Sequence, residues 1–113
     1  MGMGTGTIRI RLYVEELPPR DPEGGVRIRT TLEVAKGKGR SWATQLEWRD
    51  PEEDRWGWGV RYDTAGGKGH RDRNRSAAQE PGPLPESPGK ALNWAMRDLR
   101  CRAREYIEEF RAA

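Results

Sequence analysis

Four stretches of the chain alternate apolar and polar residues, and this pattern restricts the fold more than any other feature. A period of two places successive side chains on opposite faces of a β-strand, so each stretch predicts a strand with one buried face. In all four, the even-numbered residues are the apolar ones. The residues expected to face the core are Ile8, Ile10, Leu12 and Val14, then Val26, Ile28, Leu32 and Val34, then Trp42, Leu46 and Trp48, and last Trp56, Trp58, Val60 and Tyr62.

The connections between these stretches are too short for a helical crossover and are rich in turn residues. Residues 17–25 contain three prolines and two glycines, and Gly37 and Gly39 flank a lysine in a predicted tight hairpin. Pro51 suits the second position of a type I turn. Half-buried strands joined in this way favour an antiparallel meander. A fifth, short strand around residues 69–75 stays open because its composition is too polar to decide.

The C-terminal third predicts a tether followed by a helix. Residues 76–90 contain four prolines, which exclude a helix or a central strand, so we expect an extended tether over 76–87. Ser87 suits an N-cap with Pro88 at the first helical position, which predicts a helix over 88–111. Its apolar residues fall on one stripe of the helical wheel. The stripe consists of Leu92, Ala95, Met96, Leu99, Ala103, Tyr106, Ile107 and Phe110.

These elements predict one α+β domain over residues 1–113, with its strands within 6–75. A four- or five-stranded antiparallel meander has its apolar face covered by a single C-terminal helix. No run approaches the roughly 18 apolar residues of a membrane span, and residues 1–7 lack the apolar stretch of a secretory signal, so we expect a cytoplasmic protein without a membrane partner. One cysteine and one histidine do not suffice for the usual four-ligand zinc site, and we expect neither metal nor cofactor.

The net charge of +3 is confined to residues 61–75, because the segments on either side are balanced. A basic segment containing glycines is a candidate for binding the phosphates of RNA or DNA. Alternatively it is a solvated loop whose charges serve solubility. The predicted nucleic-acid-binding residues are Arg61, Tyr62, Asp63, Lys68, Arg71, Arg73 and Arg75.

The polar face of the predicted sheet carries further arginines but few aromatic side chains. Arg9, Arg11, Arg27 and Arg29 would form a patch that either holds a phosphate backbone or pairs with glutamates on neighbouring strands. Because four of the five tryptophans are assigned to the core, the sequence argues against an aromatic platform for single-stranded nucleic acid.

Glycines and an isolated tryptophan are the remaining local signals. Gly57 and Gly59 mark either a close backbone approach by a ligand or chain segment, or a β-bulge or sheet edge. The helical wheel places Trp94 and Cys101 opposite the apolar stripe, pointing away from the sheet. We therefore assign both to an interface with a second subunit or a protein partner. The alternative is that the Pro-rich tether covers Trp94.

Motifs of common enzymes are missing. Residues 65–70 resemble part of a P-loop, but Tyr62 and Gly69 stand where that motif requires Gly and Ser or Thr. Metal-independent cleavage of RNA makes fewer demands, since the 2′-hydroxyl is the nucleophile and the protein supplies proton transfer and cations. His70 is the candidate catalytic acid or base for such a reaction.

Several motifs together resemble a family of small bacterial proteins of unknown function. They are Trp-Gly-Val-Arg-Tyr-Asp-Thr-Ala at 58–65, Gly-His-Arg-Asp at 69–72, and Ala-Leu-Asn-Trp-Ala-Met-Arg-Asp-Leu at 91–99. In that family a strand ending in Arg-Tyr-Asp precedes a Gly-His loop and a C-terminal helix. The resemblance implies a link to toxin–antitoxin-like or mobile-element neighbourhoods and carries no established activity. It assigns importance to Arg61, Tyr62, Asp63, His70 and Arg71; a second loop histidine common in the family is replaced here by Arg71 or Asp72.

The sequence thus favours a small RNA-binding accessory protein that uses its basic Gly/His loop. Two alternatives stay open, a metal-independent ribonuclease of toxin type and an antitoxin-like protein-interaction module. The first predicts loss of cleavage in His70→Ala, and the second predicts a partner or homodimer contact through Trp94.

Overall fold

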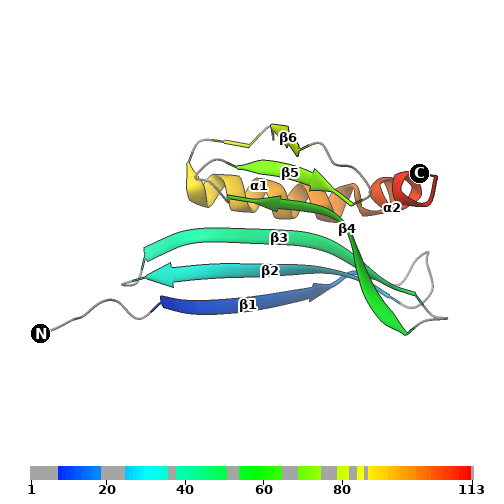
Figure 1. Ribbon diagram of the computed structural model, residues 1–113, viewed down its shortest axis with the longest axis horizontal. Coiled ribbons are helices and arrows are strands. Elements are labelled where there is room, and N and C mark those ends of the chain that lie inside the picture. Colours follow the sequence, from blue (N-terminus) through cyan, green and yellow to red (C-terminus); the bar gives the residue numbers. More distant parts are fainter. Residues whose placement is uncertain are drawn as a thin grey trace, which may run out of the picture.

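A computed structural model describes residues 8–18, 25–35, 38–50, 54–64, 69–74, 79–81, 84–85 and 87–112. Its six strands form one antiparallel sheet in which the spatial order equals the chain order (Figure 1). This arrangement confirms the α+β class and the meander. The strands are β1 (Ile8–Glu16), β2 (Val26–Ala35), β3 (Lys38–Asp50), β4 (Arg55–Asp63), β5 (His70–Arg73) and β6 (Gln79–Pro81), and the helices are α1 (Pro88–Cys101) and α2 (Ala103–Ala112).

The short strands β5 and β6 extend the predicted sheet. β5 pairs with the end of β4, so the fifth strand that the sequence left open does form. β6 lies inside the segment predicted to be a tether and pairs with β5. β6 is the last strand at this edge of the sheet. Pro81 is tolerated there because proline has no N–H to donate to a further strand on the other side.

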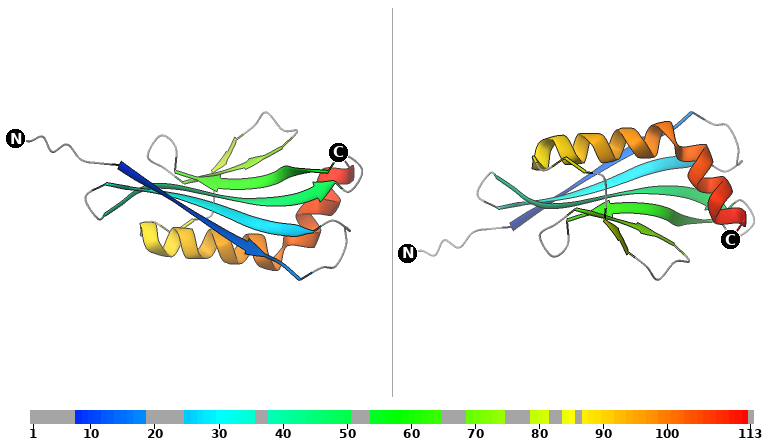
Figure 2. Two further views of the ribbon diagram at one scale, coloured as in Figure 1. Left: turned by 90° about the horizontal axis from the view of Figure 1, so that it is seen from below. Right: turned by 90° about the horizontal axis from the view of Figure 1, so that it is seen from above.

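The C-terminal helix is divided in two at Arg102. The backbone there leaves helical geometry, at φ −109° and ψ 15°, although its N–H still donates to the Asp98 carbonyl at 2.9 Å. Figure 2 shows α2 turning away from the direction of α1 while both helices stay on one side of the sheet. The bend allows Tyr106 and Ile107 to reach the core, so the single predicted helix is corrected to two.

The two faces of the sheet have different roles. We call the face covered by α1 and α2 the inner face and the opposite one the outer face. The core lies between the inner face and the helices, as predicted for the apolar side of β2 and β3. It contains Val26, Ile28, Trp42, Leu46, Trp48, Val60, Tyr62, Ala91, Ala95, Leu99, Tyr106 and Ile107.

Strand β1 presents the face opposite to the one predicted. Its register pairs Leu12 with Thr31 and Arg11 with Leu32, so the apolar residues of β1 lie on the outer face. Ile10, Leu12 and Val14 are 71, 53 and 49% exposed. The alternation shows which residues share a face, but the pairing register decides which face that is, and a shift of one residue exchanges them.

A β-bulge at Gly59 corrects the placement of two tryptophans. Leu46 pairs with Val60, but the next residue along β3, Glu47, pairs with Trp58, so Gly59 is left over. Beyond this extra residue the alternation of β4 is reversed. Trp56 and Trp58, predicted to face the core, therefore lie on the outer face.

The orientation predicted for Trp94 is wrong as well. The predicted apolar stripe is confirmed in Ala95 and Leu99, which are buried, but α1 also buries Ala91, which extends the buried side toward Trp94. Trp94 therefore lies at the margin of the buried side. It packs against the core, with its ring edge-on to Tyr62 at a centroid distance of 5.8 Å.

The described helices include none that is long and apolar enough to cross a membrane.

Candidate functional site

Two tryptophans and two arginines form a stacked cluster on the outer face. The guanidinium carbon of Arg27 lies 3.9 Å from the centroid of the Trp56 ring, and that of Arg61 lies 4.6 Å from the centroid of Trp58. Each planar cation covers an aromatic face, which is a favourable electrostatic arrangement. We call these four residues the Trp–Arg cluster. Asn74 supports the backbone beneath it, since its side chain donates to the Trp58 carbonyl at 2.7 Å and its N–H to that of Gly59 at 2.8 Å.

Arg27 is fixed in place by a buried carboxylate. Its Nε donates to Glu47 at 2.6 Å, and Glu47 is only 4% exposed. Gln45 donates to the other oxygen of the same carboxylate. A carboxylate so deeply buried is stable because it is paired and hydrogen-bonded. Glu47 therefore positions the guanidinium over Trp56.

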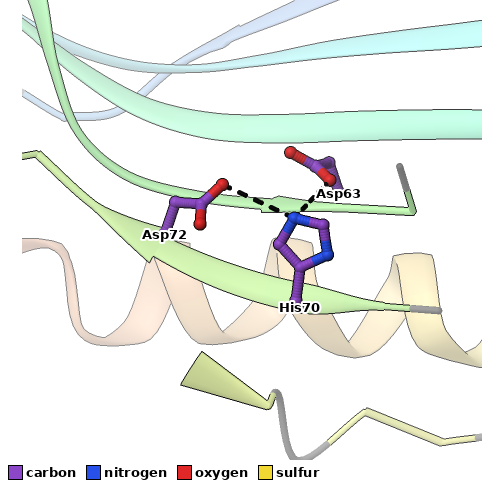
Figure 3. A group of neighbouring side chains, drawn as sticks. All are labelled: Asp63, His70 and Asp72. Atoms are coloured by element: carbon purple, nitrogen blue, oxygen red, sulfur yellow. Dashed lines mark ion pairs between the residues drawn. The ribbon is translucent and has the colours of Figure 1, made fainter. Parts of the chain in front are cut away.

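An aspartate–histidine–aspartate group stands beside the Trp–Arg cluster. Figure 3 shows His70 of β5 pointing between Asp63 of β4 and Asp72 of β5, with the helix behind the strands. His70 Nε2 lies 2.8 Å from Asp63 Oδ1 and 3.5 Å from Asp72 Oδ2. The three side chains are 15, 15 and 18% exposed. Asp63 and His70 are direct cross-strand partners, as are Arg61 and Asp72, which explains why four residues from two strands converge.

The chemistry of this group is set by its two carboxylates. Their oxygens and a histidine nitrogen lie within 4.8 Å of one another, a donor set that could hold a divalent cation. One imidazole nitrogen, Nε2, lies near both carboxylates, and Arg61 adds a cation 3.8 Å from Asp63. The two carboxylates thereby fix the orientation of the His70 ring.

A hollow of about 260 Å³ opens on the outer face next to Asp63. It spans β1 to β4, and its walls carry carboxylate and hydroxyl groups beside the aliphatic side chains of Ile10 and Ala43. Such a mixture suits a small planar group with polar edges. The lining residues are Ile10, Thr31, Glu33, Ser41, Trp42, Ala43, Asp63 and Thr64.

On the inner face, a buried polar network joins β4 to both helices. Asp98 of α1 accepts hydrogen bonds from the hydroxyls of Tyr62, at 2.6 Å, and Tyr106. Arg71 lies 3.4 Å from the Tyr62 hydroxyl, and Arg102 lies 3.5 Å from Asp98. Burial, and then the bonds to Asp98, raise the pKa of both phenols above 10.0. We assign these groups a structural role, since they lie on the inner side of the sheet and not on its outer face.

Alkaline pH is expected to unfold the protein as Tyr62 and Tyr106 ionise. Because the folded pKa of each phenol is raised, its stabilising effect is complete below the unfolded value of 10.0 and is lost as the pH rises above it. Tyrosinate absorbance and far-UV circular dichroism, followed along one pH titration, should change together. Ionisation of all three tyrosines with unchanged dichroism would contradict this expectation.

The structure divides the predicted nucleic-acid-binding residues between the two faces. Arg61, Asp63 and the predicted catalytic His70 come together on the outer face. Tyr62 is fully buried in the core and inaccessible to a ligand. Arg71 and Arg73 point to the helix side, where Arg71 contacts Tyr62 and Arg73 pairs with Glu109. Lys68 and Arg75 lie outside the described residues.

The two predicted interface residues also differ. Trp94 packs into the fold, which removes the geometric reason for placing it at an interface. Cys101 is exposed at the end of α1 and lines a cavity of about 290 Å³ together with Leu17, Val26 and Ile107. Its contact with a partner stays a prediction.

Sequence reasoning missed Trp56, Trp58 and Asp72 as members of the outer-face site. The signal for the tryptophans was the pair of glycines around Trp58, because glycine inside a strand marks a bulge and a bulge reverses the alternation. The signal for Asp72 was its spacing of two from His70, which places both on the same face of β5.

Comparisons with known proteins give a family and no activity. No curated protein and no solved structure matches this chain. One family matches residues 3–113, and its description is domain of unknown function (DUF7718). This agrees with the resemblance to an uncharacterised family that the Arg-Tyr-Asp and Gly-His motifs indicated. Since the match covers nearly the whole sequence, the chain belongs to the DUF7718 family.

Proposed function

We propose that the outer face of the sheet binds single-stranded RNA. The observation that carries this proposal is the Trp–Arg cluster, which the bulge at Gly59 brings to a face that the helices leave open. Proteins that bind single strands combine aromatic side chains, on which bases stack, with cations that contact the backbone. Trp56 and Trp58 would supply the stacking surfaces in this reading.

Arginine side chains around the tryptophans supply the phosphate contacts. Arg29 is exposed on the outer face and has no ion-pair partner among the residues that the structure describes. Arg61 covers Trp58 and lies at 3.8 Å from Asp63, longer than a strong ion pair. A base that stacks on Trp58 would displace this guanidinium toward the neighbouring phosphate. Arg61 thereby changes from an aromatic partner to a phosphate partner.

The adjacent hollow gives the proposal a place for an unstacked base. Ser41 donates to Glu33 at 3.0 Å, Thr64 bonds the Trp42 backbone, and Asp63 pairs with His70. The exocyclic amino group of a base would join these bonds as a further donor to the two carboxylates. These groups lie on the same face as the Trp–Arg cluster. An RNA strand that crosses β4 would therefore contact both the hollow and the Trp–Arg cluster.

Replacing Trp58 with alanine is expected to weaken RNA binding by about tenfold or more, since one base–aromatic stack is worth about 1–3 kcal/mol. The measurement is fluorescence anisotropy of a labelled single-stranded RNA at two or more salt concentrations. If about four phosphates are contacted, the log–log salt slope should be about −3. Arg61→Ala should weaken binding and flatten the slope.

The matched control is Arg104→Ala, which removes the same charge from the exposed side of α2. It should leave affinity and slope almost unchanged. Equal losses in the Arg61 and Arg104 variants would reduce the interaction to nonspecific charge attraction and overturn the outer-face proposal. Absence of any salt-sensitive binding would do the same.

The same samples distinguish binding from cleavage. RNA cut by the wild-type protein and left intact by His70→Ala would replace the binding proposal with the ribonuclease alternative, in which His70 acts as acid. Tighter binding to DNA of the same sequence would change the ligand class to DNA. A protein that neither binds nor cuts would leave the antitoxin-like interaction module as the alternative.

A further inference from the structure

Strand β1 exposes an apolar row at the edge of the sheet. Ile10, Leu12 and Val14 lie on the outer face with half or more of their surface in solvent. The helices cover the inner face of the sheet, where α1 packs against β2 and β3, so they leave this outer-face row uncovered (Figure 2). An exposed apolar row of this kind on an edge strand commonly marks a contact with another chain.

The edge of β1 that faces away from β2 has no strand partner among the described residues. β1 pairs with β2 on one side, and none of the described strands pairs with its other side. An edge of nine residues presents backbone N–H and C=O groups that can form a ladder with another strand. The edge and the apolar row therefore offer hydrogen bonds and apolar burial to the same partner.

The sequence of β1 is complementary to itself when two copies run antiparallel. With the two-fold axis at Leu12, the middle residue, all nine residues find a partner in the second copy. Arg9 lies opposite Glu15 of the partner subunit, and Ile10 lies opposite Val14 of the partner subunit. On the inner face Glu15 is already held by Arg100 at 2.7 Å, which keeps its carboxylate near the edge. Opposite charges and apolar pairs at facing positions both stabilise antiparallel ladders.

Other centres give poorer pairings. Facing residues must lie on the same face of the joined sheet, so the axis passes through a residue. An axis at Ile10 sets Arg9 against Arg11 of the partner subunit, and an axis at Arg11 sets two like charges face to face. An axis at Tyr13 leaves Ile10 opposite a glutamate. The axis at Leu12 sets Ile10, Leu12 and Val14 against one another, leaves only Ile8 at the end of the strand opposite Glu16 of the partner subunit, and brings no like charges face to face.

We propose that two copies of this chain pair through β1 as a symmetric antiparallel dimer with Leu12 on the two-fold axis. The contact is isologous, because the same strand serves both subunits, and it closes without leaving an open edge at β1. It rests on the exposure, register and charge pattern of β1 and does not depend on RNA binding.

Cysteine crosslinking tests both the dimer and its register. In Leu12→Cys with Cys101→Ser, the two new cysteines face each other at a Cα separation of about 4.5–5.5 Å, which is within the range of a disulfide. Mild oxidation should convert most of this variant to a covalent dimer. In the control, Ile10→Cys with Cys101→Ser, the cysteines lie about 13 Å apart along the strands and should stay monomeric.

Light scattering after size exclusion provides the second measurement on the unmodified protein. The mass should approach twice the 12.9 kDa of the chain at high concentration and fall on dilution. Leu12→Glu sets two carboxylates face to face and should weaken the dimer about 100-fold or more. Thr31→Glu, on the same face but one strand further in, should keep the dimer, and circular dichroism verifies that both variants fold.

Three outcomes would overturn the proposal. They are a monomeric mass at every concentration, equal crosslinking of the position 10 and position 12 variants, and a dimer that survives Leu12→Glu. A monomer that pairs through β1 with a strand of another protein would also replace the second copy as the occupant.

Discussion

Replacing Asp98 with alanine is expected to lower the free energy of unfolding by about 3 kcal/mol, because the change leaves two buried hydroxyls without their acceptor. Asp98 joins Tyr62 of β4 to Tyr106 of α2, and its side chain is only 8% exposed. Its loss therefore weakens the attachment of both helices to the sheet. Urea unfolding followed by circular dichroism gives the measurement.

Two companion variants make the Asp98 result interpretable. Asp98→Asn retains the shape and one acceptor, so it should lose less than the alanine variant. Glu108→Ala removes an exposed partner of Arg104 on α2 and should change stability by less than about 0.5 kcal/mol. An Asp98→Ala protein as stable as wild type would show that the two hydroxyls find other acceptors and that the network does not hold the helices.

Replacing Gly59 with alanine is expected to lower the free energy of unfolding by about 2–3 kcal/mol through overpacking. A Cβ at this position would lie 2.5 Å from Cη2 of Trp48, far inside contact distance. The Trp48 ring has little room to move, because it packs edge-on against Phe110 at a centroid distance of 4.7 Å. Relief of the clash requires movement of the core or loss of the bulge.

Gly57→Ala is the matched control, since it adds the same atom two residues away. No heavy atom lies within 4 Å of its Cβ position, so this variant should match or slightly exceed wild-type stability. Thermal unfolding of both variants under one condition tests the contrast. Equal stabilities would mean that Trp48 adapts freely and that the bulge imposes no steric demand for glycine.

The strands were predictable because their alternation is local information. The apolar rows of β2 and β3 face the core as expected, and the turn residues between them led to the correct antiparallel order. β1 shows where this information ends. The residues of β1 alone do not determine which of its two faces meets the helices. The pairing with β2 sets Leu12 opposite Thr31 and so places the apolar row on the outer face, contrary to the prediction.

The helix and the candidate site were harder to predict for the same reason. The helical wheel correctly assigned Ala95 and Leu99 to the buried stripe of α1, but it left out Ala91. Because the sheet also buries Ala91, the buried side extends to Trp94, which packs against Tyr62. Residues 61–63 read as one basic motif, yet strand geometry sends Tyr62 to the core and its two neighbours to the opposite face. Three consecutive residues therefore do not share one site.

The extra residue at Gly59 makes the character of the outer face depend on chain length. Removing one residue from β4 at this point would restore strict alternation and turn both upstream tryptophans toward the helices, without changing any side chain. A single-codon deletion or insertion would thus exchange an aromatic surface for added core volume in one step. Relatives that differ by one residue in this strand would share the fold but present different outer faces.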